Sequence, residues 1–155
     1  MSSKIEDDSF PIQLVIDKDI ATSYNSGPTP TNKPWIQLQF WREAIVRLVE
    51  ITNNKDCCGD TIFNLEIKVG NHEIDKNNPG GTIFDEDEEL IINDLCGQYL
   101  SRSVLGSNVL VWCDQPRIGK IMTIQTLENN KAGLRIAEID VYGTNSVVGK
   151  LRCWI

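Results

Sequence analysis

Two adjacent cysteines, Cys57 and Cys58, are the residues of this sequence with the most specific chemistry. They follow Asp56, just after an apolar run that is typical of a strand. Neighbouring cysteines do not easily ligate one metal ion, but they can close a small strained disulfide ring that offers a flat sulfur surface to a ligand. Two independent thiols in a loop are the other interpretation, and the pair alone does not decide between the two.

The remaining reactive side chains indicate disulfides rather than zinc binding or catalysis. The five cysteines form an odd set, with no Cys-x-x-Cys spacing and no cluster with histidine. The single histidine, His72, lies in a predicted turn, where a polar side chain is usually solvated. Ser-His-Asp and Cys-His arrangements both need a histidine beside a nucleophile. We therefore expect that the protein is not an enzyme.

Length and charge restrict the partners. A chain of 155 residues has the size of one domain, and its net charge of −7 argues against nucleic acid, whose affinity comes largely from Lys and Arg. No stretch approaches the roughly twenty consecutive apolar residues of a membrane span. The start of the chain lacks the apolar core of a signal peptide, so we expect either a cytoplasmic protein or a chain whose leader has been removed.

Alternating apolar and polar residues predict strands. In residues 35–40, Ile36, Leu38 and Phe40 fall on one face of a half-buried strand. Further strands are expected at 44–52, 64–69, 109–113, 120–125 and 134–142. No window has a sustained helical period. Many short strands separated by turn residues predict an antiparallel sandwich or barrel.

Two local features modify this pattern. The apolar phase of residues 134–142 switches between Ile136 and Ala137, which predicts a β-bulge that re-aims Glu138. Residues 71–107 are expected to be loops at one end of the sandwich, with one strand at 90–93. The acidic run 85–89 within them is expected to be a solvated edge.

The order of the motifs resembles a known family. The motifs are Pro34-Trp35 before a strand, then Ile51-Thr52, Asp56-Cys-Cys-Gly59, Glu66-Ile-Lys-Val-Gly-Asn71 and Glu138-Ile-Asp-Val-Tyr-Gly143. This order resembles the F-type lectin (fucolectin) family, within the galactose-binding-like, F5/8 type C (discoidin) set of jelly-roll domains. The resemblance covers residues 12–143 and implies a single all-β domain, an eight-stranded antiparallel jelly roll. Residues 1–11 would be a lead-in, and 144–155 a C-terminal tail or an extra strand.

The resemblance also implies a structural calcium ion. Asp17, Asp19 and Thr22 occupy the positions of the family's calcium loop, and Glu138 matches the carboxylate that the last strand supplies. Calcium takes six to eight oxygen ligands, which aspartates, a hydroxyl, a glutamate and carbonyls can provide. Lys18 stands where glycine is usual. An ordinary Asp-capped turn is the alternative interpretation of this loop.

The fucose site that the resemblance implies is incomplete. Two arginines that donate to the sugar in the family are replaced by Asn54 and Thr61, and residues 24–33 contain no histidine to supply the third donor. Each charge-assisted hydrogen bond contributes on the order of 1.5–3 kcal/mol, so we expect the fucose site to be degenerate. The expected ligand contacts are Asn32, Asn54, Lys55, Cys57, Cys58, Asp60 and Thr61.

The remaining cysteines fit the same resemblance. Cys96 and Cys113 resemble a family disulfide that joins two loops, whereas another family cysteine is replaced by Ala137 and its upstream partner is also absent. Cys153 is then left as a free thiol, a bridge to a second chain or an inert buried residue.

Two functions follow from these expectations. The first is a non-catalytic, calcium-stabilised binding module for a glycan, with a degenerate fucose site. The second is a structural or protein-interaction module that has lost sugar binding, with contacts through its loops, the acidic run 85–89 or Cys153. Disulfides favour an extracellular, secreted protein, whereas the lack of a visible leader would fit an intracellular or ciliary assembly.

Overall fold

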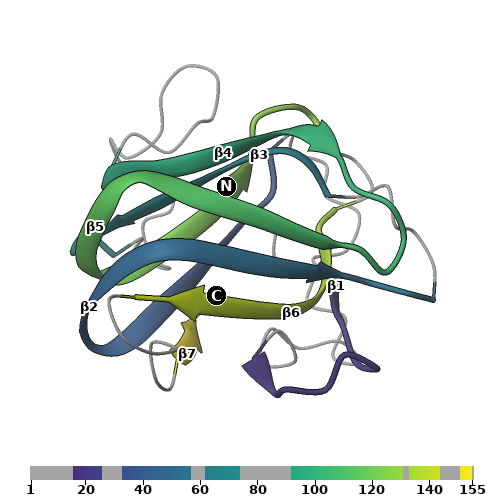
Figure 1. The fold of residues 1–155 in the computed structure, drawn as a ribbon, viewed down its shortest axis with the longest axis horizontal. Coiled ribbons are helices and arrows are strands. Elements are labelled where there is room, and N and C mark those ends of the chain that lie inside the picture. The colour runs from purple at the N-terminus through teal and green to yellow at the C-terminus, as the bar shows by residue number, and fades with distance from the viewer. Residues whose placement is uncertain are drawn as a thin grey trace.

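The chain folds into strands joined by loops. A computed structural model describes residues 16–25, 33–56, 62–73, 92–130, 133–143 and 151–154. The strands are β1 (Tyr24–Asn25), β2 (Trp35–Asn53), β3 (Phe63–Gly70), β4 (Asp94–Arg102), β5 (Asn108–Thr126), β6 (Arg135–Tyr142) and β7 (Leu151–Trp154). All their pairings are antiparallel. Figure 1 shows this arrangement.

The strands form one sheet that folds over itself. Its order is β1-β6-β2-β5-β3-β4, and β7 also pairs with β2. Although β3 lies between β4 and β5 in this order, a disulfide joins Cys96 of β4 to Cys113 of β5. A Cβ atom placed on Gly97 of β4 would lie 2.3 Å from the carbonyl oxygen of Trp112 in β5. The sheet therefore closes on itself, as in a jelly roll.

The two longest strands, β2 and β5, pass through both layers. The first part of β2 pairs with β7 and with the last part of β5, whereas its last part pairs with β6 and with the first part of β5. Both strands bend between the two parts (Figure 1), where the register of their pairing shifts. Register shifts of this kind bend a strand and increase its twist.

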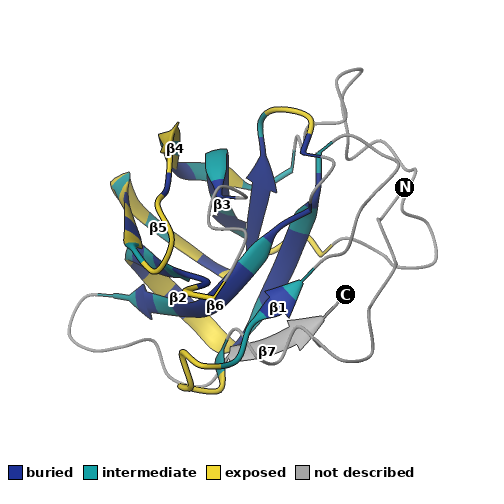
Figure 2. Ribbon diagram, turned by 90° about the vertical axis from the view of Figure 1, so that its right-hand side faces the viewer, coloured by how far each residue is buried: buried dark blue, intermediate teal, exposed yellow. Residues whose placement is uncertain are grey.

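The core lies on the inward face of these strands. Leu65, Ile67 and Val69 of β3 are fully buried, as their alternation predicts. Ile36 and Leu38 of β2 join the same core. Figure 2 shows buried residues along β3, β6 and much of β2, and exposed residues along β4. In β5, exposed residues lie in the first part and the last six residues are buried. Burial of aliphatic side chains on one face of each strand thus stabilises the closed sheet.

The predicted fold class is confirmed, and so is the bulge in the last long strand. Thr52 and Asn53 are adjacent in β2, but they pair with Glu138 and Ile136 of β6. Ala137 is the extra residue, and this bulge leaves Ala137 and Glu138 both buried. Eight strands were expected, and the described residues contain seven.

Several predicted strand boundaries are wrong. The segments 35–40 and 44–52 belong to the single strand β2, and 109–113 and 120–125 both belong to β5. The strand expected at 90–93 begins at Asp94 instead, and β4 replaces the loop predicted there. β4 was not predicted because it has a glycine in its interior and an exposed second half, so apolar and polar residues do not alternate clearly along it.

The C-terminal segment contributes an added strand. β7 pairs with residues 37–40 of β2. This placement fits the expected extra strand within 144–155, and the domain limits at residues 11, 12, 143 and 144 stay predictions. The acidic run 85–89 lies outside the described residues.

Tyr142 ties three strands together on the outer face. Its hydroxyl donates to Glu50 Oε2 at 2.9 Å, and Asn108 Nδ2 donates to Glu50 Oε1 at 2.6 Å. These contacts connect the end of β6, the last part of β2 and the start of β5.

We expect Tyr142→Phe to remove a pH-dependent part of the stability. The hydrogen bond to Glu50, followed by burial and the charges of Glu50 and Asp140, raises the pKa of Tyr142 above its ordinary 10. This stabilisation is fully present below pH 10 and is lost as the pH rises through the higher pKa of the folded state. Urea unfolding should give a loss of about 1 kcal/mol for Tyr142→Phe at pH 8, and no loss at a pH above the folded pKa. An equal loss at both pH values would contradict this role.

Candidate functional site

One end of the sandwich gathers the loops that carry the sequence motifs. Strand β2 ends there, β3 begins there, and the β4–β5 turn lies between them. The backbone N–H of Asn53 donates to the Ser107 carbonyl at 2.9 Å, and the N–H of Gly106 donates to the Asn54 carbonyl at 2.9 Å. On the other side, the N–H of Ser103 donates to the Ile62 carbonyl at 2.9 Å. The turn thus holds both ends of the segment 54–62, and we call this region the loop end.

Asn54 joins this segment to residues 17–23, which we call the acidic loop and which precede β1. Its side chain is only 8% exposed. Its Nδ2 donates to Ser23 Oγ at 3.0 Å, and its Oδ1 accepts from the N–H of Asp56 at 2.8 Å. Both hydrogen bonds of the amide lie within the protein, and the expected ligand contact of Asn54 stays a prediction. Asn54 therefore links Ser23 to Asp56.

We expect Asn54→Ala to destabilise the loop end by about 2 kcal/mol, because it removes both hydrogen bonds of a buried amide. Ser23→Ala removes one of these bonds and should cost about 1 kcal/mol. In the double variant, the loss should be smaller than the sum of the two single losses. Chemical denaturation of the four proteins measures this coupling, and strict additivity would mean that the Ser23–Asn54 contact does not contribute.

The acidic loop caps its own turn. Asp17 Oδ1 accepts from the N–H of Asp19 at 2.8 Å, and Asp19 Oδ1 accepts from the N–H of Ala21 at 2.9 Å. Thr22 Oγ1 lies 2.8 Å from Asp17 Oδ2 and 2.8 Å from the carbonyl oxygen of Asp19. The loop is thus organised by its own side chains, as in an Asp-capped turn.

Glu138 approaches this loop from the bulge of β6. Its side chain is 3% exposed, and its Oε2 accepts from the backbone N–H of Lys18 at 2.8 Å. Its Oε1 is buried and has no hydrogen-bond donor. Burial raises the pKa of Glu138, the bond and charge of Lys18 lower it in part, and the charges of Asp140 and Asp17 raise it further. The net effect is a pKa above the ordinary value of 4.5.

Lys18 supplies a positive charge beside these carboxylates. Its Nζ lies 3.7 Å from Glu138 Oε1 and forms an ion pair with Asp140. Burial alone would lower the pKa of Lys18, but the hydrogen bond and charge of Asp140, together with Glu138, raise it above 10.5. The residue has φ of 66°, a conformation that lysine rarely adopts and glycine adopts readily.

The expected calcium ligands are brought together in part. Carboxylate and hydroxyl oxygens are suitable calcium ligands, and Glu138 Oε1, which has no hydrogen-bond donor, is an oxygen that a cation would satisfy. In type, these residues fit the ion. Across the described ranges, however, no three His, Cys, Asp or Glu side chains are grouped closely enough to form a metal site. The calcium site therefore stays a prediction.

Most of the other expected ligand contacts lie outside the described residues. These are Asn32, Cys57, Cys58, Asp60 and Thr61. Lys55 is described and exposed, and a Cβ atom on Gly106 would lie 3.5 Å from its Cβ. Lys55 thus lies beside Gly106 of the β4–β5 turn.

The cysteines agree with the expected pattern where they are described. Cys96 and Cys113 form a disulfide, and Cys96 is fully buried. Ala137, which replaces a cysteine of the family, is buried at the bulge. Cys153 lies in β7.

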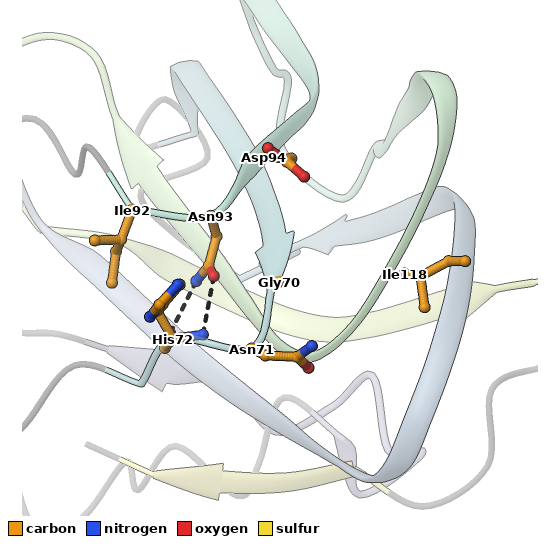
Figure 3. Close-up of a pocket in the computed structure, with 7 residues that line it drawn as sticks. All are labelled: Gly70, Asn71, His72, Ile92, Asn93, Asp94 and Ile118. Carbon is orange, nitrogen blue, oxygen red and sulfur yellow. Dashed lines mark hydrogen bonds between the residues drawn. The ribbon is translucent and has the colours of Figure 1, made fainter.

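A hollow with a volume of about 480 Å³ lies at the end of β3 and β4 that is opposite to the loop end. It is lined by Gly70, Asn71, His72, Ile92, Asn93, Asp94 and Ile118 (Figure 3). Asn93 Oδ1 accepts from the N–H of His72 at 3.0 Å, and its Nδ2 donates to the His72 carbonyl at 2.8 Å. Asn71 Oδ1 accepts from the N–H of Lys120 at 3.0 Å. These amides hold the strand ends together.

Comparison with known proteins supports the resemblance that the motifs indicate. The chain is 25% identical over 125 residues to Fucolectin-1 of Anguilla japonica, across 81% of this chain and 61% of that protein. A fucolectin from striped bass (Morone saxatilis) serum superposes with a TM-score of 0.67 at 20% identity, across 92% of this chain and 45% of that one. The resemblance to F-type lectins is confirmed. No protein-family model matches this chain.

The same fold occurs in other sugar-binding modules. A CBM32 module of Clostridium perfringens, solved in complex with GalNAc-β-1,3-galactose, superposes with a TM-score of 0.65 at 12% identity. The superposition covers 86% of this chain and 84% of the Clostridium perfringens module. By contrast, the chain spans about three fifths of the eel protein and less than half of the striped bass protein. In the part of the chain that the structure describes, there is no helix of the length and apolarity needed to cross a membrane.

Two contributions at the loop end were not predicted. Lys18 was noted as a departure from glycine, but its pairing with Asp140 depends on the bulge that turns β6 toward the loop. The buried side chain of Asn53 donates to Ser103 Oγ at 2.9 Å and to the Val104 carbonyl at 2.8 Å. The adjacent pair Asn53-Asn54 at the end of a strand was the signal that could have indicated these hydrogen bonds from Asn53 to the β4–β5 turn.

Proposed function

We propose that this chain is a non-catalytic, extracellular carbohydrate-binding module whose glycan site lies at the loop end. One observation carries this proposal. The described residues that match the family's sugar and calcium positions come from distant parts of the sequence and converge there, where Asn54 contacts Ser23. Similarity to fucolectins in sequence and fold supports the same conclusion.

The proposed site is degenerate with respect to fucose. Asn54 stands where the resemblance places an arginine. Its amide donates a hydrogen bond to Ser23 Oγ and accepts one from the N–H of Asp56. Lys55 offers a cation from the next position, but an ammonium group cannot replace the planar fork of an arginine. We propose that the surface of Cys57 and Cys58 provides an apolar platform and that neutral side chains nearby provide the hydrogen bonds. The preferred glycan then differs from fucose.

Calcium belongs to the proposed module as a stabilising ion. Asp17, Asp19, Thr22 and Glu138 would hold it, and the buried oxygen of Glu138 that lacks a donor supports this assignment. When bound, calcium would link the loop before β1 to β6 and so stabilise the loop end.

A glycan array, probed once with calcium and once with chelator, tests the proposal. We expect binding to a defined glycan that weakens in chelator and weakens at least several-fold in Lys55→Ala. The matched control is Lys120→Ala, which removes an equal charge at the opposite end of β3 and should bind normally. Folded protein that binds none of the glycans would refute the carbohydrate function.

The second candidate is a protein-interaction module, and an apolar outer face favours it. Leu110 and Trp112 of β5 are 51% and 64% exposed, and they pair in register with Glu50 and Leu48 of β2. Absence of glycan binding by folded protein, together with loss of a partner in Trp112→Ala, would support this candidate over the first.

The extracellular location rests on the Cys96–Cys113 disulfide, since reducing compartments would open it. Thiol titration of denatured protein from its native source tests this part of the proposal. Five free thiols per chain would contradict it.

A further inference from the structure

Lys18 places both of its nitrogens against the same buried carboxylate. The backbone N–H donates to Glu138 Oε2 at 2.8 Å, and Nζ lies 3.7 Å from Glu138 Oε1. The left-handed conformation of Lys18, with φ of 66°, goes with this double approach. Such a conformation costs a non-glycine residue roughly 1–2 kcal/mol, so surrounding contacts must stabilise it.

The ammonium group meets a local excess of negative charge. Asp17 and Asp140 both act on Glu138 with their charges, and all three carboxylates come from the loop and the strand that Lys18 joins. A buried carboxylate without a compensating charge is strongly destabilising. Lys18 supplies that compensation with its own side chain, which is 60% exposed and therefore open to exchange with solvent ions.

We propose that Lys18 is a built-in counter-cation that competes with calcium for Glu138, so that the loop folds without the metal and binds it weakly. The inference rests on the calcium site of the proposed function. Both cations need Glu138 Oε1, which has no hydrogen-bond donor. Two positive charges a few ångströms apart repel each other, so calcium must displace the ammonium group before it binds.

Competition requires that the ammonium group of Lys18 can leave Glu138 without disturbing the loop. The ammonium group can leave because its side chain is mostly exposed and reaches solvent without rearrangement of the loop. The backbone bond from Lys18 to Glu138 Oε2 can stay in place when Nζ departs, since it involves the other carboxylate oxygen. Calcium would therefore replace only the charge of Lys18 and not its backbone contact.

The test compares the wild type with Lys18→Asn, because asparagine tolerates the left-handed conformation and carries no charge. Calcium chloride is titrated into each protein by calorimetry, and the melting temperature is measured in EGTA and in calcium. We expect the wild type to melt only slightly higher in calcium than in EGTA, because it binds calcium weakly. Lys18→Asn should melt several degrees lower in EGTA, recover in calcium and bind calcium at least tenfold more tightly. Lys120→Asn, at the opposite end of β3, removes the same charge and should behave as the wild type does.

Three results would overturn the inference, and they are distinguishable. Equal calcium affinity and equal melting in the wild type and Lys18→Asn would exclude the competition. Tight calcium binding by the wild type, with a large loss of stability in EGTA, would keep the calcium site but exclude an internal substitute. Destabilised Lys18→Asn that binds no calcium would remove both the competition and the proposed calcium site, while leaving the glycan array to test the sugar site. If Lys18→Asn is unfolded in EGTA, its recovery of β-sheet circular dichroism with calcium supplies the same measurement.

Discussion

Opening the Cys96–Cys113 disulfide is expected to lower the free energy of unfolding by about 3 kcal/mol. The two cysteines are 17 residues apart in sequence, and a bridge over a loop of this length restricts the unfolded chain by roughly that amount. The bridge also joins β4 to the first part of β5, two strands that do not pair with each other. Cys96→Ala/Cys113→Ala should therefore lower the melting temperature by about 9 °C in a scanning experiment.

The same double variant provides its own control. Reductant should shift the melting temperature of the wild type but should have little effect on the variant. Its three remaining cysteines are Cys57, Cys58 and Cys153. Titration of the denatured, unreduced variant should find one thiol if Cys57 and Cys58 form a ring, and three if they do not. A melting temperature within about 1 °C of the wild type would contradict a stabilising role for the Cys96–Cys113 bridge.

Gly119→Ala is expected to have a comparable effect through backbone contact. A Cβ atom at position 119 would lie 2.2 Å from the carbonyl oxygen of Gly70 and 2.6 Å from its Cα atom. All of these atoms belong to the backbone, so no side-chain rotation can relieve the contact, and β3 must move away from β5. We expect a loss of about 3 kcal/mol, at the upper end for an overpacked position.

Gly106→Ala is the matched control for Gly119→Ala. At Gly106 the nearest atom to an added Cβ is 3.5 Å away, and the cost comes only from its φ of 69°. This conformation costs alanine about 1 kcal/mol. Urea unfolding of the two variants should therefore differ by about 2 kcal/mol. Equal losses would mean that β3 and β5 separate easily at Gly119.

The sequence predicted those features that depend on local pattern. The alternation of Leu65, Ile67 and Val69 correctly predicted a buried strand face, and the phase change at Ala137 correctly predicted the bulge. Both follow directly from the period of two that a strand imposes on its side chains. The motif order also predicted the fold class and the Cys96–Cys113 disulfide through resemblance to a family.

Features that depend on distant contacts were missed. Residues 41–43 interrupt the alternation because they lie exposed in the bend of β2, so one strand looked like two. Asn54 and Asn93 are residue types typical of loops, but Asn54 binds the Ser23 hydroxyl and Asn93 binds the backbone of His72, both distant in sequence. Which groups these amides reach is set by the closure of the sheet, and no local pattern carries that information.

The passage of β2 and β5 through both layers also determines how this protein can be made. In the pairing of β2 with β5, Trp35 lies opposite Gln125, and Thr52 lies opposite Asn108. Neither layer can be completed until β5 has left the ribosome, and pairings this distant in sequence close slowly. During that interval the apolar faces of β2 and β3 are exposed to other chains. Biosynthesis of this module therefore depends on protection of the first half of the chain, and a product truncated before Thr126 would aggregate rather than fold.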